Sequence, residues 1–108
     1  MSVKLELDAL LPHVLDQCNV TWELDEQEQR HFTRMITDAV DYFQRRTGPD
    51  LDVTQGNVRA LVINRVFYDF HRRLEWFENN YQNEISELLL SYAAMEHSLL
   101  EREANGDY

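Results

Sequence analysis

The chain of 108 residues is strongly acidic, with a net charge of −10, and it contains one cysteine, Cys18. This length predicts a single domain, 1–108, and a lone cysteine cannot form a disulfide within the chain, which fits a reducing, cytosolic compartment. No apolar run approaches the roughly 20 residues that cross a bilayer and no signal-peptide core opens the sequence, so we expect a soluble protein. Because an acidic chain repels nucleic acid over most of its surface, tight duplex binding through a large phosphate footprint is disfavoured.

The first apolar series predicts a short helix over residues 7–18. Its members recur at steps of three and four residues and therefore share one helical face. They are Leu7, Leu10, Leu11, Val14, Leu15 and Cys18. Pro12 interrupts the series, and proline fits comfortably only in the first turn of a helix. We therefore expect this helix to begin near residues 8–11 or to have a distorted first turn.

The next helix has clear start and stop signals. Asp25 is a favourable N-cap, and Glu28 three residues later completes an aspartate form of the capping box. Arg45 and Arg46 suit the last turn, Gly48 is predicted to be a left-handed terminator, and Pro49 stops the helix. The apolar face between these signals consists of Phe32, Met35, Ile36, Ala39, Val40 and Phe43. We predict a helix from about residue 25 to 46, followed by a loop over residues 47–56.

The segment from residue 57 to 105 contains neither glycine nor proline, which favours helix throughout. Apolar residues recur along it at steps of three and four and fall within a stripe about 120° wide. The stripe consists of Ala60, Ile63, Phe67, Phe70, Leu74, Phe77, Tyr81, Ile85, Leu88, Tyr92, Met95 and Leu99. At ~1.5 Å per residue, a helix over residues 57–99 is roughly 60 Å long, about twice the diameter of a domain of this size.

Two arrangements reconcile this length with a small domain. The helix breaks at the weak helix formers Asn79 and Asn80 and folds back, or it continues outward and packs its C-terminal stripe on other subunits. A periodic pattern longer than about 25 residues without caps favours the second. The sequence thus predicts an all-α protein: a small bundle of three to four helices with a long C-terminal helix, in which residues 82–108 project and end in an acidic tail.

Six of the aromatic residues gather in Val66–Gln82, and most of them lie on the stripe. Between residues 60 and 70 the other faces are apolar as well, which predicts burial on all sides, and no single-strand-binding motif supports base stacking. Trp76 lies opposite the stripe, where it either covers neighbouring side chains or anchors a partner. We predict an oligomer or partner interface formed by Trp76 and the exposed part of the stripe, namely Tyr81, Ile85, Leu88, Tyr92 and Met95.

No motif for catalysis or cofactor binding is present. The three glycines form no phosphate-binding loop, and no nucleophile elbow or zinc pattern occurs. Glu28 and His31 form one half of a di-iron Glu-x-x-His pair whose second copy is missing, and Asp50 and Asp52 lack the calcium-loop pattern. Cys18 is expected to be a buried small hydrophobe. We therefore predict no enzymatic activity, no cofactor and no metal site.

The charge is uneven along the chain. Residues 1–28 carry seven acids and one base, residues 29–73 carry five acids and eight bases, and residues 74–108 carry eight acids and one base. Three interpretations of the acidic segments are open. They keep the protein in solution, they line a channel through which DNA slides without sticking, or they imitate DNA.

Two segments resemble sequences of the small head-tail connector, or adaptor, proteins of tailed bacteriophages: DAVDYFQRRTG and VRALVINRVFYDFHRRLEWFENNYQNEISEL. In such proteins a helix ends in an aromatic residue and Thr-Gly, which corresponds here to Tyr42–Gly48. A second long helix carries an aliphatic run, an arginine and Tyr-Asp-Tyr/Phe, here Leu61–Phe70, and then Phe-Glu-Asn-Asn-Tyr, here Phe77–Tyr81. The resemblance covers roughly residues 25–90.

The resemblance implies an all-helical structural protein of the virion neck without enzymatic activity. Such a protein assembles as a ring under the portal, with twelve copies to match the portal's symmetry, extends the DNA channel and docks the next tail or stopper protein. DNA passes through without sequence-specific binding, and the subunit resides in the host cytoplasm during assembly. Composition leaves one alternative, a small acidic regulator that mimics DNA and binds a basic nucleic-acid-binding protein.

Overall fold

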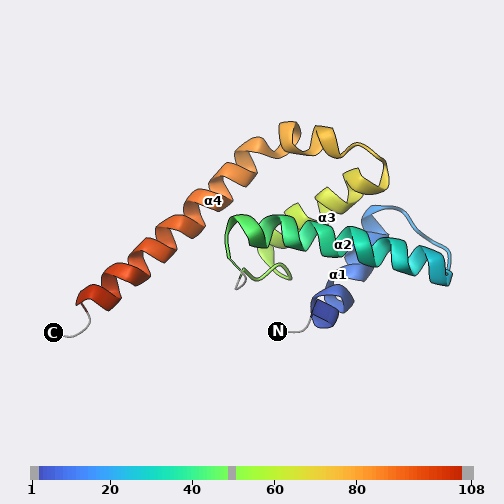
Figure 1. Ribbon diagram of the computed structural model, residues 1–108. Coiled ribbons are helices and arrows are strands. Elements are labelled where there is room, and N and C mark those ends of the chain that lie inside the picture. The colour runs from blue at the N-terminus through green and yellow to red at the C-terminus, as the bar shows by residue number, and fades with distance from the viewer. Residues whose placement is uncertain (1–2, 49–50, 106–108) are drawn as a thin grey trace.

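Four helices form the part of the chain that the computed structural model describes, residues 3–48 and 51–105 (Figure 1). They are α1 (Val3–Gln17), α2 (Glu26–Arg46), α3 (Gly56–Phe70) and α4 (Leu74–Asn105), and these residues include no strand. Side chains are described over residues 7–48 and 51–94. The predicted all-α bundle of three to four helices with a long C-terminal helix is confirmed. No described helix is both long enough and apolar enough to cross a membrane.

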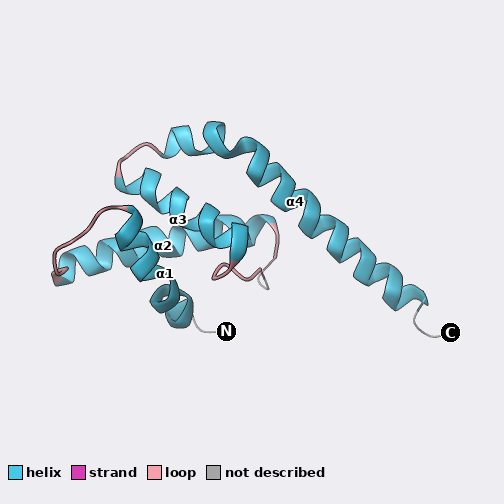
Figure 2. Cartoon of the chain, turned by 180° about the vertical axis from the view of Figure 1, so that it is seen from behind, coloured by secondary structure: helices cyan, strands magenta, loops and turns pink. Residues whose placement is uncertain are grey.

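The molecule measures 59 × 30 × 18 Å, because the end of α4 runs beyond the other helices. Figure 2 shows the same outward course of α4 from behind.

α1 continues through Pro12, so the expected start near residues 8–11 is wrong. Leu10 and Val14 flank the proline and are fully buried at 0% exposure, whereas Pro12 itself faces solvent. A proline inside a helix removes one backbone hydrogen bond and strains the preceding turn, at a cost of about 3 kcal/mol. Burial of two large apolar side chains, worth about 1.5–3 kcal/mol each, offsets that cost.

α2 begins and ends where the sequence predicts. The Asp25 carboxylate accepts a hydrogen bond from the Glu28 N–H (2.8 Å), and the Glu28 carboxylate accepts one from the Asp25 N–H (3.1 Å). Trp22 adds a hydrogen bond from its indole N–H to the other Glu28 oxygen (2.9 Å). All six predicted apolar residues of this helix are buried. The predicted capping box and core face of α2 are therefore confirmed, whereas the predicted left-handed conformation of Gly48 is wrong.

The chain reverses direction at residues 71–73. Neither of the two predicted arrangements has a break at this position. The Arg73 N–H donates to the Tyr68 carbonyl (2.7 Å), and the Arg72 N–H donates to the Asp69 carbonyl (3.0 Å). Arg72 has a φ of 58°, in the left-handed region. These contacts form a Schellman C-cap in which an arginine occupies the position that glycine usually takes. The prediction of one continuous helix from residue 57 is therefore wrong.

α4 has a second irregularity at Tyr81, where φ is −116° and ψ is 17°. This kink lies directly after the predicted weak point at Asn79 and Asn80, but it bends the helix without reversing the chain (Figure 1). The predicted break at these asparagines is therefore a bend, and the fold-back occurs earlier, at residues 71–73.

α3 is the central helix and packs against each of the other three. Its buried residues are Leu61, Val62 and Val66, whereas Ala60, the first residue of the predicted stripe, is exposed. The other stripe residues of α3, Ile63, Phe67 and Phe70, are half-buried and pack against the core, so within α3 the stripe is wrong only at Ala60. The predicted burial of this stretch on more than one face is confirmed. Leu51 and Val53 of the preceding loop complete the core.

Phe77 joins α4 to the other helices. Its ring is 0% exposed and makes edge-to-face contacts with Phe43 at 6.3 Å, Tyr42 at 6.5 Å and Tyr68 at 5.9 Å between centroids. Tyr81, one turn later, stacks on Phe77 at 5.0 Å. Aromatic pairs of this geometry add about 0.5–1.5 kcal/mol each beyond their buried area. The start of α4 is thus fixed against both α2 and α3.

Replacing Phe77 with alanine should destabilise the fold by about 3–5 kcal/mol, because it opens a cavity at the meeting point of three helices. Urea unfolding followed by circular dichroism measures this loss. The neighbouring Trp76→Ala variant is the matched control: Trp76 is 54% exposed, and we expect a loss below about 1 kcal/mol. Equal losses in the two variants would contradict the central position of Phe77.

Candidate interaction surfaces

The polar side chains that the sequence offers as candidates for a metal site make hydrogen bonds or close contacts with neighbouring residues. Glu28 is engaged in the capping box and by Trp22, and the Nδ1 atom of His31 lies 3.4 Å from a guanidinium nitrogen of Arg34. Asp52 accepts hydrogen bonds from the Thr54 hydroxyl and from the Thr54 N–H (2.9 Å), and these two bonds lower the pKa of its carboxyl. Asp50 lies outside the described residues. Among residues 7–48 and 51–94, no three His, Cys, Asp or Glu side chains are placed to hold a metal ion.

Cys18 closes α1 and lies in the core, with 7% of its surface exposed. Burial raises the pKa of its thiol from 9.0 to about 11. The thiolate, which is the nucleophilic form, is therefore scarce at neutral pH. Cys18 acts here as a small apolar side chain.

The residues predicted to form an interface lie in different environments. Trp76 is exposed, Tyr81 is half-buried against Phe77, and Ile85 belongs to the core with 8% exposure. Leu88 and Tyr92 are half-buried and pack against that core, and the side chain of Met95 is outside the described set. The prediction that Ile85 is exposed is wrong, because the reversal and the kink bring this part of α4 back over its own domain.

Tyr92 is the last described side chain of α4 that packs on the core. Its ring covers Gly48 at the end of α2 so closely that a Cβ atom at position 48 would lie 2.9 Å from the tyrosine hydroxyl. On the other side of α4, Leu90 is 71% exposed. The stripe could not identify Leu90, since this leucine lies off the predicted apolar face.

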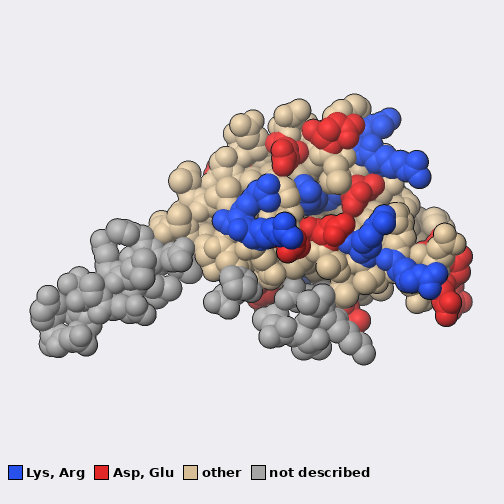
Figure 3. All heavy atoms as spheres, viewed as in Figure 1, with Lys and Arg blue, Asp and Glu red and all other residues tan. Residues whose placement is uncertain are grey.

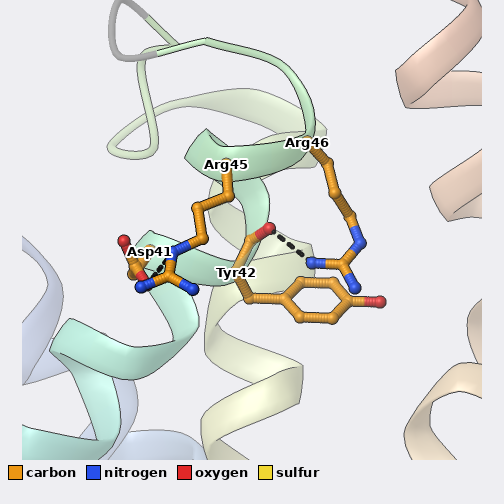
Figure 4. Close-up of polar contacts among 4 residues, drawn as sticks. All are labelled: Asp41, Tyr42, Arg45 and Arg46. Carbon is orange, nitrogen blue, oxygen red and sulfur yellow. Dashed lines mark hydrogen bonds and ion pairs between the residues drawn. The ribbon is translucent and has the colours of Figure 1, made fainter.

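A polar cluster holds α2, α3 and α4 together next to Phe77. The guanidinium carbons of Arg46 and Arg65 each lie 3.7 Å from the centre of the Tyr42 ring, and two cations this close to one ring require opposite faces. The Tyr42 hydroxyl donates to a carboxylate oxygen of Glu78 (2.9 Å). Arg46 also donates to the Tyr42 carbonyl (3.0 Å), and Figure 4 shows its guanidinium over the ring.

This cluster is a structural joint, because each of its four side chains already has a partner within the chain. Burial raises the pKa of the Tyr42 hydroxyl, the hydrogen bond to Glu78 adds to that shift, and the nearby charge of Arg46 opposes it. Burial also lowers the pKa of Arg65, against the attraction of Tyr42 and Glu78. Cation–π contacts contribute about 0.5–2 kcal/mol each, depending on exposure.

An open groove of about 660 Å³ lies between the start of α2 and the end of α3. Phe32 and Phe70, whose ring centroids lie 5.3 Å apart, line it together with Arg30, His31 and Arg34. The acids of the α2 capping box also line it, so its charge is mixed. An open, mixed-charge groove is suited to contact with another macromolecule rather than to enclosing a small substrate.

The arginines contribute little to ion pairing. Among the described side chains, the only ion pair within 4.0 Å joins Arg45 to Asp41 at 2.7 Å (Figure 4). Figure 3 shows basic and acidic side chains interspersed over this face of the molecule. At the reversal, Arg72, Arg73 and Trp76 form what we call the turn cluster, in which the guanidinium carbon of Arg73 lies 5.2 Å from the indole ring.

Introducing a carboxylate at Ile85 should destabilise the fold by at least about 3 kcal/mol, because it removes buried apolar area and buries a charge. Leu90→Asp adds the same charge five residues later at an exposed site, and its unfolding midpoint should stay close to that of the wild type. Thermal unfolding followed by circular dichroism compares the two. A stable Ile85→Asp variant would show that α4 does not pack on its own domain.

Raising the pH should weaken the fold through Tyr42. The pKa of this hydroxyl is higher in the folded chain than its ordinary value of 10.0, so the unfolded chain loses the proton first. The stabilisation is therefore complete below pH 10 and is lost as the pH rises through the folded pKa. Tyr42→Phe should cost about 0.5–1.5 kcal/mol of stability at neutral pH. As the pH rises above 10, this variant should lose less stability than the wild type, because it has no hydroxyl to ionise at this position. Urea titrations at several pH values measure both, and an unchanged alkaline slope would contradict this role.

Comparison with known proteins identifies no relative of this chain. No protein-family model matches the sequence, and no curated protein and no solved structure shows significant similarity to it. A functional assignment therefore depends on the residues, on their geometry and on the motif resemblance.

Proposed function

We propose that this chain is a structural protein of the neck of a tailed bacteriophage, a head-tail connector or adaptor. In this proposal the subunits form a ring of twelve copies under the portal protein, extend the DNA channel and dock the next tail or stopper protein. The ring is a part of the virion and carries no enzymatic activity. Its subunits are made and assembled in the host cytoplasm.

The observation that carries this proposal is the convergence of the three motif segments. Tyr42–Gly48, Leu61–Phe70 and Phe77–Tyr81 are separated in sequence, yet they meet at one joint. The guanidinium of Arg65, from the second segment, stacks on the ring of Tyr42, from the first segment. Phe77, from the third segment, contacts Tyr42 of the first segment and Tyr68 of the second. The residues that carry the resemblance therefore meet at the joint that sets the direction of α4, and this convergence supports the proposal.

The course of α4 supports a subunit built for assembly. Its first half belongs to the domain, and after Tyr92 the helix backbone continues to Asn105 beyond the other helices (Figure 2). At ~1.5 Å per residue this outer part is roughly 20 Å long. A helix of that length outside its own core gains stability by packing against another subunit. Head-to-tail contacts of this kind close into a ring when the rotation between subunits allows it.

The charge distribution fits a channel protein better than a DNA mimic. A mimic requires carboxylates spaced along an exposed face with few bases among them, whereas arginines and acids alternate over the face in Figure 3. An acidic ring repels the DNA backbone at a distance, so DNA passes without adhering. A salt-sensitive complex with a basic DNA-binding protein, and no ring, would favour the mimic instead.

Assembly of the full chain, alone and with portal protein, tests the proposal by native mass spectrometry and negative-stain electron microscopy. We expect closed rings on the portal. Leu90→Asp should weaken assembly at least about tenfold while leaving the fold intact, because an exposed leucine contributes about 1.5–3 kcal/mol when a neighbour buries it. Ser91→Asp adds the same charge at the next exposed position and serves as the control. A wild-type chain that remains monomeric alone and with portal protein would contradict the proposal.

A further inference from the structure

Leu90 on α4 is the most exposed large apolar side chain among those that the structure describes, at 71%. Residues three and four positions apart are neighbours on a helix surface, and those beside Leu90 on its exposed face are small or acidic. They are Ser86, Glu87, Ala93 and Ala94, all of them exposed. This face of α4 therefore presents one leucine next to a carboxylate, with no bulky side chain around it.

The groove of about 660 Å³ at the start of α2 offers a matching surface, because apolar and basic side chains line it together. Phe32 and Phe70 supply the apolar part, and Arg30 and Arg34 supply positive charge. Neither of these arginines has a carboxylate within 4.0 Å among the described side chains, since the acids of the groove are engaged in the α2 capping box. Helices commonly bind by placing an apolar anchor in such a groove.

The charges of the two surfaces are complementary. Residues 82–94 of α4 carry two acids, Glu84 and Glu87, and no base. The turn cluster follows Phe70 closely in the chain, so its two exposed arginines add positive charge at the same end of the molecule as the groove. Figure 3 shows basic side chains over the start of α2 and over the reversal. A surface with one leucine and a carboxylate thus faces one with phenylalanines and arginines.

One copy cannot place its own Leu90 in its own groove. α4 begins close to Phe70, which lines the groove, and at ~1.5 Å per residue Leu90 lies roughly 24 Å further along the helix. We infer that Leu90 of one copy docks in the groove of the next copy, with Glu87 facing Arg30 and Arg34. This inference rests on the proposed ring, for which it names the two surfaces that meet.

The contact is heterologous, since each copy contributes its helix to one neighbour and its groove to the other. Beyond its kink, α4 runs toward the side of the molecule opposite to the start of α2 (Figure 1). Two surfaces placed in this way join copies head to tail, which is the arrangement that a ring requires. Burial of the leucine supplies affinity, whereas the charges orient the helix and make the contact weaken with added salt.

Cross-linking of engineered cysteines in the full chain tests the inference, both alone and with portal protein. Ala94→Cys and Gln27→Cys in one chain place a thiol on each surface, because Ala94 lies one turn after Leu90 and the exposed Gln27 lines the groove. A short bismaleimide should link each copy to the next and give a ladder of multimers on a denaturing gel. Either substitution alone should give no ladder, since the native Cys18 is buried.

The matched control combines Ala94→Cys with Gln55→Cys. Gln55 is exposed and makes no side-chain capping bond at the start of α3, roughly 22 Å along that helix from Phe70. The same thiol chemistry at this distance from the groove should give no ladder.

A charge exchange between copies gives a second readout. Glu87→Arg in one variant, and Arg30→Glu with Arg34→Glu in another, each oppose like charges at the contact and should weaken assembly about threefold to tenfold in sedimentation velocity. Mixed in equal amounts, the two variants restore opposite charges at every contact, and assembly should return. Glu84→Arg is the control, because Glu84 lies roughly 120° around the helix from Leu90. Circular dichroism checks that all variants fold.

The outcomes separate the inference from the proposed function. Rings on the portal without a ladder, an equal ladder in the Gln55 control, or mixed charge variants that fail to assemble would overturn the inference and leave the proposed ring intact. A ladder without rings on the portal would support the contact and contradict the proposed function. A chain that neither cross-links nor forms rings contradicts both.

Discussion

Burial of Phe77 between α2 and α3 is the contact on which the rest of the structure depends. The ring has no exposed surface and is surrounded by Phe43, Tyr42, Tyr68 and Tyr81. It fixes the first turns of α4 against the bundle, and the backbone must therefore reverse immediately before it. The left-handed Arg72, which costs about 1–2 kcal/mol relative to glycine at that position, is tolerated because the aromatic packing that it allows contributes more.

The same joint divides α4 into two parts with different roles. From Phe77 to Tyr92 the helix completes the core of its own domain, which explains why Ile85 is buried and Leu88 and Tyr92 are partly covered. Beyond Tyr92 the helix runs past the other three. The mismatch between helix length and domain size is thus smaller than the sequence suggests, and it concerns the outer part alone. In the proposed ring another subunit covers this part together with the exposed Leu90 just before it.

The arginines of this acidic chain stack on aromatic rings more often than they form ion pairs. Arg46 and Arg65 enclose the Tyr42 ring at 3.7 Å each, and Arg73 contacts Trp76 at 5.2 Å. A planar guanidinium stacks well on aromatic faces and keeps its charge at every physiological pH. At the joint Arg65 is half-buried and Arg46 lies exposed beside it, whereas at the reversal both Arg72 and Arg73 are exposed to solvent. The second arrangement is the one that suits a partner.

The sequence by itself determined the all-α class, the limits of α2 and its buried face, because these depend on signals a few residues apart: the Asp25–Glu28 capping box, the Gly48–Pro49 stop and an apolar period of three to four. It also singled out Trp76 as lying off the apolar face. The tertiary structure alone decided the passage of α1 through Pro12, the reversal at Arg72 and the burial of Ile85. In each case a local preference is overruled by packing against residues distant in sequence, since arginine gives no turn signal and apolar period does not report where a helix ends.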